Sequence, residues 1–476
     1  MRHFDLVVIG SGPGGQKAAI QAAKLGRKVC VVEKMQFVGG VAINTGTIPS
    51  KALKEAVVDL KAAQRAIAGF SGSGALVMDR RTQLSTLSQS CNRVIRAEIE
   101  VVRTHFASNG IEVLTGLGSL TGKDTVLVQG DHASETISGK HILIATGTTP
   151  TTPADIPFDG VQVFTSDEIL GIGTLPGTMI VVGGGVIGTE YASMLAAMGV
   201  RVTLIEGRNR LLDFLDAELI EALQYHLRQM GTTLRLGEKV VKIRKVDAPA
   251  GSRNSSGGAE MVEATLESGK TLRADCLMYC VGRQGATDKL NLAAAGLTAD
   301  ERGRIKVNAN FQTEVPNIYA VGDVIGFPAL ASTSMEQGRL AACHMFNERS
   351  DSVPELFPYG IYAIPEISMV GWTEEKLTAA AIPYEAGVAH YRETARGQLL
   401  GDDIGMLKLL IHQESGVILG VHILGSQATE LVHIGQAAMA FKGTVEYFVN
   451  TVFNYPTLAE CYKVAAFNGR NKLRSI

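Results

Sequence analysis

The chain has 476 residues, which predicts two to four domains because a single hydrophobic core rarely grows that large. Hydrophobic residues make up 46% and charged residues 19%, so the composition is that of a globular protein and excludes a disordered chain. A formal net charge of −2 gives no electrostatic basis for binding nucleic acid or an anionic membrane surface.

Targeting and membrane signals are not found in the sequence. No apolar run reaches the roughly 18 residues that span a bilayer, and the N-terminus lacks a signal-peptide pattern. The six cysteines form no C-x-x-C pair, which suits a reducing cytoplasm. We therefore expect a cytoplasmic protein with small-molecule partners, without a nucleic-acid or membrane partner.

The first predicted elements form a unit that recurs later in the chain. Residues 5–33 hold an apolar strand, the motif G-x-G-x-x-G, an alanine-rich helix ending near Gly26, and a strand ending in Glu33. Residues 179–206 repeat this order and end in Glu206. In both copies, 23 positions separate the first glycine from the glutamate. The repeat predicts two βαβ units that each bind a dinucleotide.

Each glycine of the motif has its own physical role. The first permits a tight turn from strand to helix, the second lets the backbone approach a pyrophosphate, and the third lets the helix pack on the strand. The helix N-terminus then offers free N–H groups to the phosphates. A carboxylate at the end of the second strand can accept hydrogen bonds from ribose hydroxyls. These glycines are Gly10, Gly12 and Gly15 in the first copy and Gly183, Gly185 and Gly188 in the second.

The glycine motifs stop at about residue 346. Strand-like patterns follow at residues 406–412 and 417–425, and helical ones at 428–441 and 458–469. This part of the sequence predicts a separate α+β domain. No cluster of histidine, cysteine and aspartate has metal-ligand spacing, so we expect no metal site.

Two further motifs resemble those of a known family. ILIATGTTP at residues 142–150 and IYAVGDVIG at 318–326 are similar to the flavin-domain fingerprints of the pyridine nucleotide–disulfide oxidoreductases. The resemblance implies an α/β fold with two Rossmann-type domains, one inserted in the other, and a C-terminal α+β dimerisation domain. The FAD domain would comprise residues 1–150 and 276–345, the NAD(P) domain 151–275, and the dimerisation domain of a homodimer 346–476.

The motifs and the resemblance together assign a set of residues to binding FAD, NAD or NADP. Among them, Asp323 aligns with the aspartate that holds the flavin ribitol; otherwise it is a turn aspartate. The full set is Gly10, Gly12, Gly14, Gly15, Glu33, Lys34, Lys51, Thr146, Gly147, Gly183, Gly185, Gly188, Glu206, Arg208, Gly282 and Asp323.

The segment where the family carries its redox-active disulfide lacks both cysteines. The family pattern GG-T-C-x-N-x-G-C-I-P-S-K corresponds here to GGVAINTGTIPSK, with Ala42 and Thr47 at the cysteine positions. Neither side chain can be oxidised to a disulfide, so a dithiol relay is chemically impossible.

The family's C-terminal motif H-P-T-x-x-E is altered as well. Pro456, Thr457 and Glu460 match, but Tyr455 replaces the histidine that serves as acid and base for thiol chemistry. A phenol with a pKa near 10 is a poor base at neutral pH. The joint loss of thiols and base argues against a disulfide substrate.

Several stretches are similar to one group within the family, the energy-independent pyridine nucleotide transhydrogenases. They are GTIPSKAL, YGIYAIPEISMVGWTEE and VEYFVNTVFNYPT. This resemblance implies FAD-dependent ping-pong hydride transfer between NADPH and NAD+. One alternative is an NAD(P)H:quinone or dye reductase of the same fold. Another, of a different class, is a non-catalytic redox sensor.

The resemblance also implies roles for particular charges. Lys51 and Glu190 would pair near flavin N5 as the catalytic residues, unless they form only a surface salt bridge. A helix starting near residues 331–334 would point its N-terminus at the flavin, unless it is an ordinary core helix. Glu206 favours NAD(H), whereas Arg208 and Arg210 could pair with the 2′-phosphate of NADP(H) or lie solvated in a loop.

Overall fold

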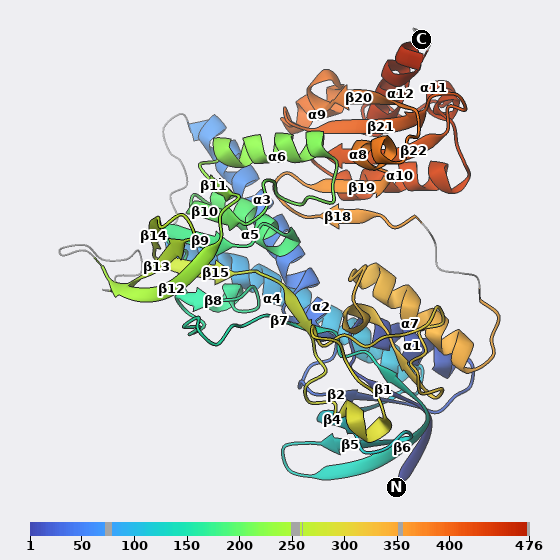
Figure 1. The fold of residues 1–476 in the computed structure, drawn as a ribbon. Coiled ribbons are helices and arrows are strands. Elements are labelled where there is room, and N and C mark those ends of the chain that lie inside the picture. The colour runs from blue at the N-terminus through green and yellow to red at the C-terminus, as the bar shows by residue number, and fades with distance from the viewer. Residues whose placement is uncertain (72–78, 249–257, 259, 351–355, 474–476) are drawn as a thin grey trace.

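The structure, a computed structural model, describes residues 1–71, 79–248, 258, 260–350 and 356–473. Figure 1 shows three parts: a sheet near the N-terminus, a second sheet in green, and a C-terminal part in orange and red. No helix among the residues described is both long and apolar enough to cross a membrane.

The first sheet has strands in the order β3-β2-β1-β6-β5-β4, with β17 paired to β6. The pairs β1–β2, β2–β3, β1–β6 and β6–β17 are parallel. Because β17 comes from beyond the second sheet in the chain, two distant segments complete one unit. The bounds are β1 Arg2–Ile9, β2 Val29–Glu33, β3 Glu112–Thr115, β4 Leu117–Leu120, β5 Thr125–Gln129, β6 Ser134–Ile144 and β17 Ile318–Ala320.

Helices cover this sheet and extend from it toward the other two parts (Figure 1). The α1 and α7 helices cross closely, since a Cβ on Gly338 would lie 2.0 Å from the carbonyl oxygen of Gly14. Apolar side chains of α1, α4 and α7 pack with the sheet in one core. The bounds are α1 Pro13–Lys24, α2 Gly40–Asn44, α3 Thr47–Ser71, α4 Arg80–Ser108 and α7 Ala331–Met345.

The second sheet is parallel, in the order β11-β10-β9-β15-β8. Its strands are β8 Val163–Phe164, β9 Thr178–Val182, β10 Arg201–Glu206, β11 Thr233–Leu236 and β15 Cys276–Tyr279, with helices α5 Val186–Ala197 and α6 Ala217–Gln229. Thus β15 begins one residue beyond the expected domain end at 275 and pairs with β9.

An antiparallel three-stranded sheet and a two-stranded ribbon accompany the second sheet. The ribbon pairs β7 with β16 where the chain enters and leaves this part. The bounds are β12 Val240–Asp247, β13 Glu260–Leu266, β14 Thr271–Ala274, β7 Thr148–Pro150 and β16 Arg283–Gly285. Short 3₁₀ helices span Ile169–Gly171, Leu292–Ala295, Gly322–Ile325 and Tyr391–Glu393.

The C-terminal part is an antiparallel sheet, β18-β19-β22-β21-β20, with helices packed against it. The predicted strands and helices of this α+β domain are confirmed, and β21 spans the predicted residues. The bounds are β18 Tyr359–Ile361, β19 Ile367–Gly371, β20 Tyr384–His390, β21 Met406–His412, β22 Ile418–Leu424, α8 Glu374–Ala379, α9 Ala395–Leu400, α10 Ala428–Ala440, α11 Val445–Asn450 and α12 Glu460–Leu473. The predicted mixed α/β fold class is therefore confirmed.

Candidate functional site

The first glycine loop lies at the carboxyl end of β1, where segments from much of the chain meet. Gly10 has φ +102°, and a Cβ there would lie 2.4 Å from the carbonyl oxygen of Ala145 at the end of β6. A Cβ on Gly14 would lie 2.9 Å from Val321, which follows β17, and one on Gly15 would lie 2.1 Å from the Gly10 oxygen. Glycine is therefore required at these three positions by the protein's own packing.

Gly12 and Gly185, the middle glycines of the two motifs, are different. Gly12 has φ −65° and ψ 177°, and Gly185 has φ −75° and ψ −172°, conformations open to any residue. A Cβ on Gly12 would come no closer than 3.9 Å to other atoms, and one on Gly185 would meet nothing within 4 Å. Neither backbone strain nor packing explains glycine here. Both positions leave space at a helix N-terminus, where a dinucleotide pyrophosphate fits.

The two glutamates that end β2 and β10 accept equivalent hydrogen bonds. Glu33 Oε2 accepts a bond from Ser11 N at 3.0 Å, and Glu206 Oε2 accepts one from Gly184 N at 2.7 Å. In each case the other oxygen accepts from the N–H two residues further on, at 2.9 Å. Each buried carboxylate thus fixes its glycine loop to the second strand.

The two units differ in the residue that lies two positions after the glutamate. It is Met35 in the first unit and Arg208 in the second. Arg208 Nε donates to Glu206 Oε1 at 3.0 Å, so the residues expected to favour opposite nucleotides pair with each other. Burial alone would raise the pKa of Glu206, but the hydrogen bonds from Arg208 and Gly184 outweigh burial and hold this pKa below its usual value.

Lys51 and Glu190 lie together where the three parts of the chain meet. Lys51 Nζ on α3 lies 3.0 and 2.8 Å from the two carboxylate oxygens of Glu190 on α5. Tyr362, just after β18, donates its backbone N–H to Glu190 at 2.8 Å, and its ring centroid lies 4.8 Å from Lys51 Nζ. Because Glu190 is buried, it fixes the lysine ammonium in place. Sequence reasoning gave Tyr362 no role.

The two fingerprint segments carry polar groups that the protein leaves poorly satisfied. Thr146 Oγ1 is buried without a hydrogen-bond partner among the described residues. Burial raises the pKa of Asp323, whose side chain receives a hydrogen bond from Thr148 at 3.5 Å. Arg283 also bonds Thr148, with 2.8 Å between Nε and Oγ1. Buried groups of this kind normally have partners, so this environment fits a polar ligand such as FAD.

The segment without cysteines lies beside the first glycine loop. Gly39 N donates to Ser11 Oγ at 2.8 Å, and a Cβ on Gly40 would lie 2.9 Å from the Gly12 Cα. Ala42 lies on α2, which begins at Gly40, and Thr47 begins α3. The position of a family disulfide therefore holds a methyl group and a hydroxyl.

The other predicted residues have varied surroundings. Lys34 is exposed, and Gly147 (φ +65°) accepts a backbone hydrogen bond from Ala286 at 3.0 Å. Gly282 (φ +80°) lies between β15 and the ribbon and packs against Thr151. The residue just after β15 that contacts the second glycine loop is instead Cys280. The α7 helix begins at Ala331, within the predicted range.

Tyr455 lies on the surface of the C-terminal part, with 68% of the residue exposed. Glu460 Oε2, which follows in the same motif, is buried without a partner among the residues described. Other large apolar side chains are exposed on this part of the chain. They are Trp372, Leu399, Phe441, Tyr447, Val452 and Phe467.

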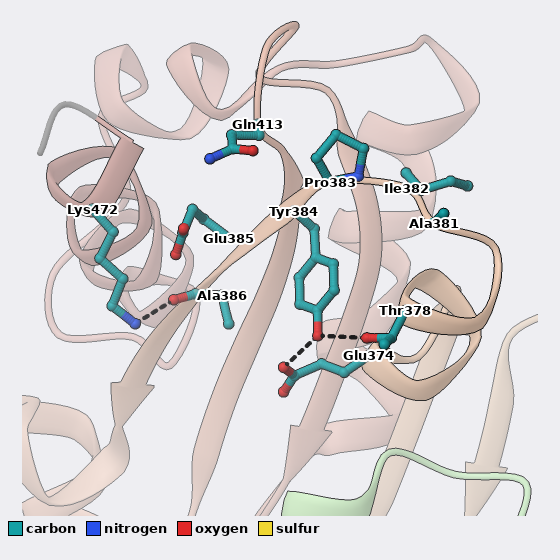
Figure 2. Close-up of a pocket in the computed structure, with 10 residues that line it drawn as sticks. All are labelled: Glu374, Thr378, Ala381, Ile382, Pro383, Tyr384, Glu385, Ala386, Gln413 and Lys472. Atoms are coloured by element: carbon teal, nitrogen blue, oxygen red, sulfur yellow. Dashed lines mark hydrogen bonds between the residues drawn. The ribbon is translucent and has the colours of Figure 1, made fainter. Parts of the chain in front are cut away.

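A hollow of about 550 Å³ lies between α8, β20 and the end of α12, and none of the predicted nucleotide-binding residues lines it. Figure 2 shows the Tyr384 hydroxyl directed at Glu374, to which it donates at 3.0 Å. On the other side, Lys472 donates to the Ala386 carbonyl oxygen at 2.6 Å. The candidate nucleotide-binding residues therefore lie elsewhere than this hollow.

Three carboxylates, from Asp216, Glu218 and Glu374, lie close enough together to hold a metal ion. The ammonium of Lys408, a fully buried residue on β21, lies among them, 3.0 Å from Asp216 and 2.9 Å from Glu218, and also bonds Glu374. Burial alone would lower the pKa of Lys408, but the carboxylates outweigh burial and raise this pKa. The cluster thus joins the C-terminal sheet to α6 through an internal cation.

Comparison with known proteins agrees with this geometry. The sequence profile described as "Pyridine nucleotide-disulphide oxidoreductase" matches residues 4–338, and the profile of its dimerisation domain matches residues 357–466. The chain belongs to the pyridine nucleotide-disulphide oxidoreductase family. The family resemblance predicted from the motifs is confirmed, including the C-terminal dimerisation domain.

Two relatives within the family match over nearly their whole lengths. The "Soluble pyridine nucleotide transhydrogenase" of Mycobacterium bovis (strain BCG / Pasteur 1173P2) is 52% identical over 479 residues, covering 100% of this chain and 99% of that protein. A protein of the same name from Vibrio vulnificus (strain YJ016) is 45% identical over 480 residues, covering 99% of each.

Two solved structures share the fold of this chain. The "HOCl-induced flavoprotein disulfide reductase RclA" from Escherichia coli has a TM-score of 0.83 at 26% identity, covering 96% of this chain and 98% of that one. LpdA from Mycobacterium tuberculosis has a TM-score of 0.86 at 23% identity, covering 98% and 99%. At 23% identity, the similarity to LpdA shows a shared fold alone.

Proposed function

We propose that this protein is a pyridine nucleotide transhydrogenase, which transfers hydride between NADPH and NAD+ through FAD. One observation carries the proposal: two equivalent glycine loops each leave space for a pyrophosphate, while Ala42 and Thr47 stand where the family's thiols would be. An enzyme built this way binds both nucleotides but has no disulfide to pass electrons to. The full-length relatives at 52% and 45% identity carry the same activity in their names.

FAD would be held by the first loop and its surroundings. Gly12 leaves space for the pyrophosphate, Glu33 fixes the loop and lies beside the expected ribose position, and Thr146 and Asp323 offer buried polar groups. When bound, FAD accepts hydride from one nicotinamide and gives it to another. The second nucleotide unit would extend from residue 151 through β15, with Gly185 at the pyrophosphate and Glu206 and Arg208 at the adenosine ribose.

Lys51 would supply a fixed positive charge where hydride is exchanged. Glu190 and Tyr362 orient its ammonium, so no reorganisation is needed when negative charge develops nearby. The helix α7, which starts at Ala331, would add the positive end of its dipole. Neither group needs to transfer a proton, and hydride exchange through FAD would need no acid–base step at Tyr455.

The working assembly would be a homodimer in a reducing compartment such as the cytoplasm. The dimerisation domain and the exposed apolar side chains of the C-terminal part support the homodimer. All six thiols are free, which suits a compartment where disulfides do not persist.

Steady-state kinetics test the proposed function. Because one site serves both nucleotides in turn, double-reciprocal plots of NADPH against thio-NAD should be parallel, as ping-pong exchange requires. A panel with quinones, oxygen and dihydrolipoamide, using the same NADPH, serves as the comparison. Intersecting lines would exclude the mechanism. Fast quinone reduction with negligible thio-NAD reduction would favour the quinone reductase.

Nucleotide choice should depend on the Arg208 side chain. Arg208→Met installs the residue that the first unit has at the equivalent position, Met35. A hydrogen bond to a charged group is worth about 1.5–3 kcal/mol, so kcat/KM for NADPH should fall by roughly one to two decades. The value for NADH should change by less than about threefold, because NADH lacks the 2′-phosphate. Equal losses with both nucleotides would contradict the assigned contact.

A further inference from the structure

The guanidinium of Arg208 is held by two carboxylates. Its Nε and Nη2 lie 3.0 and 3.1 Å from the two oxygens of Glu206, and its Nη1 lies 2.6 Å from Asp213 Oδ1. All three nitrogens are therefore engaged. Because a guanidinium has five N–H groups, a 2′-phosphate that pairs with Arg208 through Nη1 either displaces Asp213 or binds beside its negative charge.

Glu206 and Asp213 differ in how readily they can release the arginine. Glu206 is buried and also fixes the glycine loop through Gly184, so its displacement would disturb the site for either nucleotide. The side chains of Asp213 and Arg208 are 47% and 45% exposed. Of the two carboxylates, Asp213 is the one that a phosphate arriving from solvent can replace.

The backbone around Asp213 is braced independently of its carboxylate. Arg210 Nη2 donates to the Asp213 carbonyl oxygen at 2.8 Å, and Arg210 Nη1 lies 3.3 Å from Glu375. The same Glu375 oxygen accepts a bond from Ala217 N at 3.0 Å, at the start of α6. The loop is thus fastened to α6 and α8 by groups other than the Asp213 side chain, which keeps this carboxylate beside Arg208.

We propose that Asp213 is a specificity-determining residue that competes with the 2′-phosphate of NADP(H) for Arg208; this inference rests on the proposed function. NAD(H) binds without disturbing the pair between Asp213 and Arg208. The 2′-phosphate of NADP(H) must either displace the carboxylate from Nη1 or bind beside it, and in both cases it meets the negative charge of Asp213. Asp213 therefore weakens the binding of NADP(H) alone and limits the advantage that Arg208 gives this nucleotide.

Binding to the FAD-loaded protein tests this without turnover. Titration calorimetry would compare 2′,5′-ADP with 5′-AMP, which lacks the 2′-phosphate, for the unaltered protein and for Asp213→Asn. An exposed ion pair and one like charge together are worth a few-fold in affinity. We expect Asp213→Asn to bind 2′,5′-ADP about fivefold more tightly and 5′-AMP within about twofold. The gain should shrink at high salt.

Two further variants serve as controls. Asp300→Asn removes the same charge from another exposed pair, in which Asp300 and Arg304 lie 2.8 Å apart, and should leave both affinities unchanged. Arg208→Met combined with Asp213→Asn should abolish the gain, because the gain depends on the freed arginine. Asp213→Ala provides a second test in case the amide of Asp213→Asn forms new hydrogen bonds. The FAD content of each variant reports whether it folds.

The results separate this inference from the proposed function. If 2′,5′-ADP affinity is unchanged or lower, or if both ligands change alike, Asp213 only supports the loop and the inference is overturned. This holds even if NADPH still reduces thio-NAD. If 2′,5′-ADP binds more tightly as expected but no nucleotide exchange occurs, the role of Asp213 in nucleotide binding stands and the transhydrogenase proposal fails.

Discussion

Gly12→Val should give a protein largely free of FAD, whereas Gly185→Val should retain FAD and lose binding of 2′,5′-ADP and 5′-AMP. Both glycines have backbone conformations that valine adopts, and their Cβ positions meet no protein atom closer than 3.9 Å. The new side chain would instead fill the space left for a pyrophosphate at the N-terminus of α1 or α5. Flavin absorbance per chain and calorimetry measure the two outcomes.

The two variants are matched controls for each other, because they make the same change in equivalent loops. Circular dichroism would establish that Gly12→Val folds, and Gly12→Ala, with its smaller side chain, should retain more FAD. Full flavin content in Gly12→Val would refute the assignment of the first loop. Loss of FAD from Gly185→Val would show that the two loops do not bind separate nucleotides.

Anaerobic titration with dithionite should reduce the protein with two electrons per FAD, and no thiolate-to-flavin charge-transfer band should appear near neutral pH. A redox-active disulfide would take two more electrons, but Ala42 and Thr47 cannot form one. The six cysteines are all free. Burial raises the pKa of every thiol: to about 11 for Cys91, to about 12 for Cys30, Cys276, Cys280 and Cys461, and upward for Cys343.

The raised thiol pKa values explain why no thiolate band is expected at neutral pH. A raised pKa keeps a thiol protonated until the pH rises toward that value, so thiolate is scarce at pH 7. The double variant Ala42→Cys/Thr47→Cys restores the family's pair and should take up four electrons per FAD. Uptake of four electrons by the unaltered protein, or turnover of dihydrolipoamide, would reveal a second redox couple and contradict the proposed chemistry.

Local signals in the sequence predicted much of the fold and of the candidate site. The repeated βαβ units and the elements of the C-terminal part were predictable, because hydrophobic periodicity and glycine spacing act over short stretches. The family was predicted from the resemblance of the motifs at residues 142–150 and 318–326. The absence of a dithiol relay needed only the identities of Ala42 and Thr47, since no tertiary structure can make them redox-active. The pairing of Lys51 with Glu190 came from family resemblance rather than from any local pattern.

Other features depended on contacts between segments far apart in the chain. The placement of Tyr362 beside Lys51 and the burial of Lys408 among three carboxylates join different parts of the fold, and no local periodicity encodes such contacts. The sequence predicted that Glu206 favours NAD(H) and that Arg208 could favour NADP(H). In the folded loop these two side chains bond each other, and Arg208 also bonds Asp213. The sequence by itself determined which chemical groups are available and the local elements that carry them. Only the tertiary structure decided which charges meet, because hydrogen bonds and ion pairs depend on distances that folding alone sets.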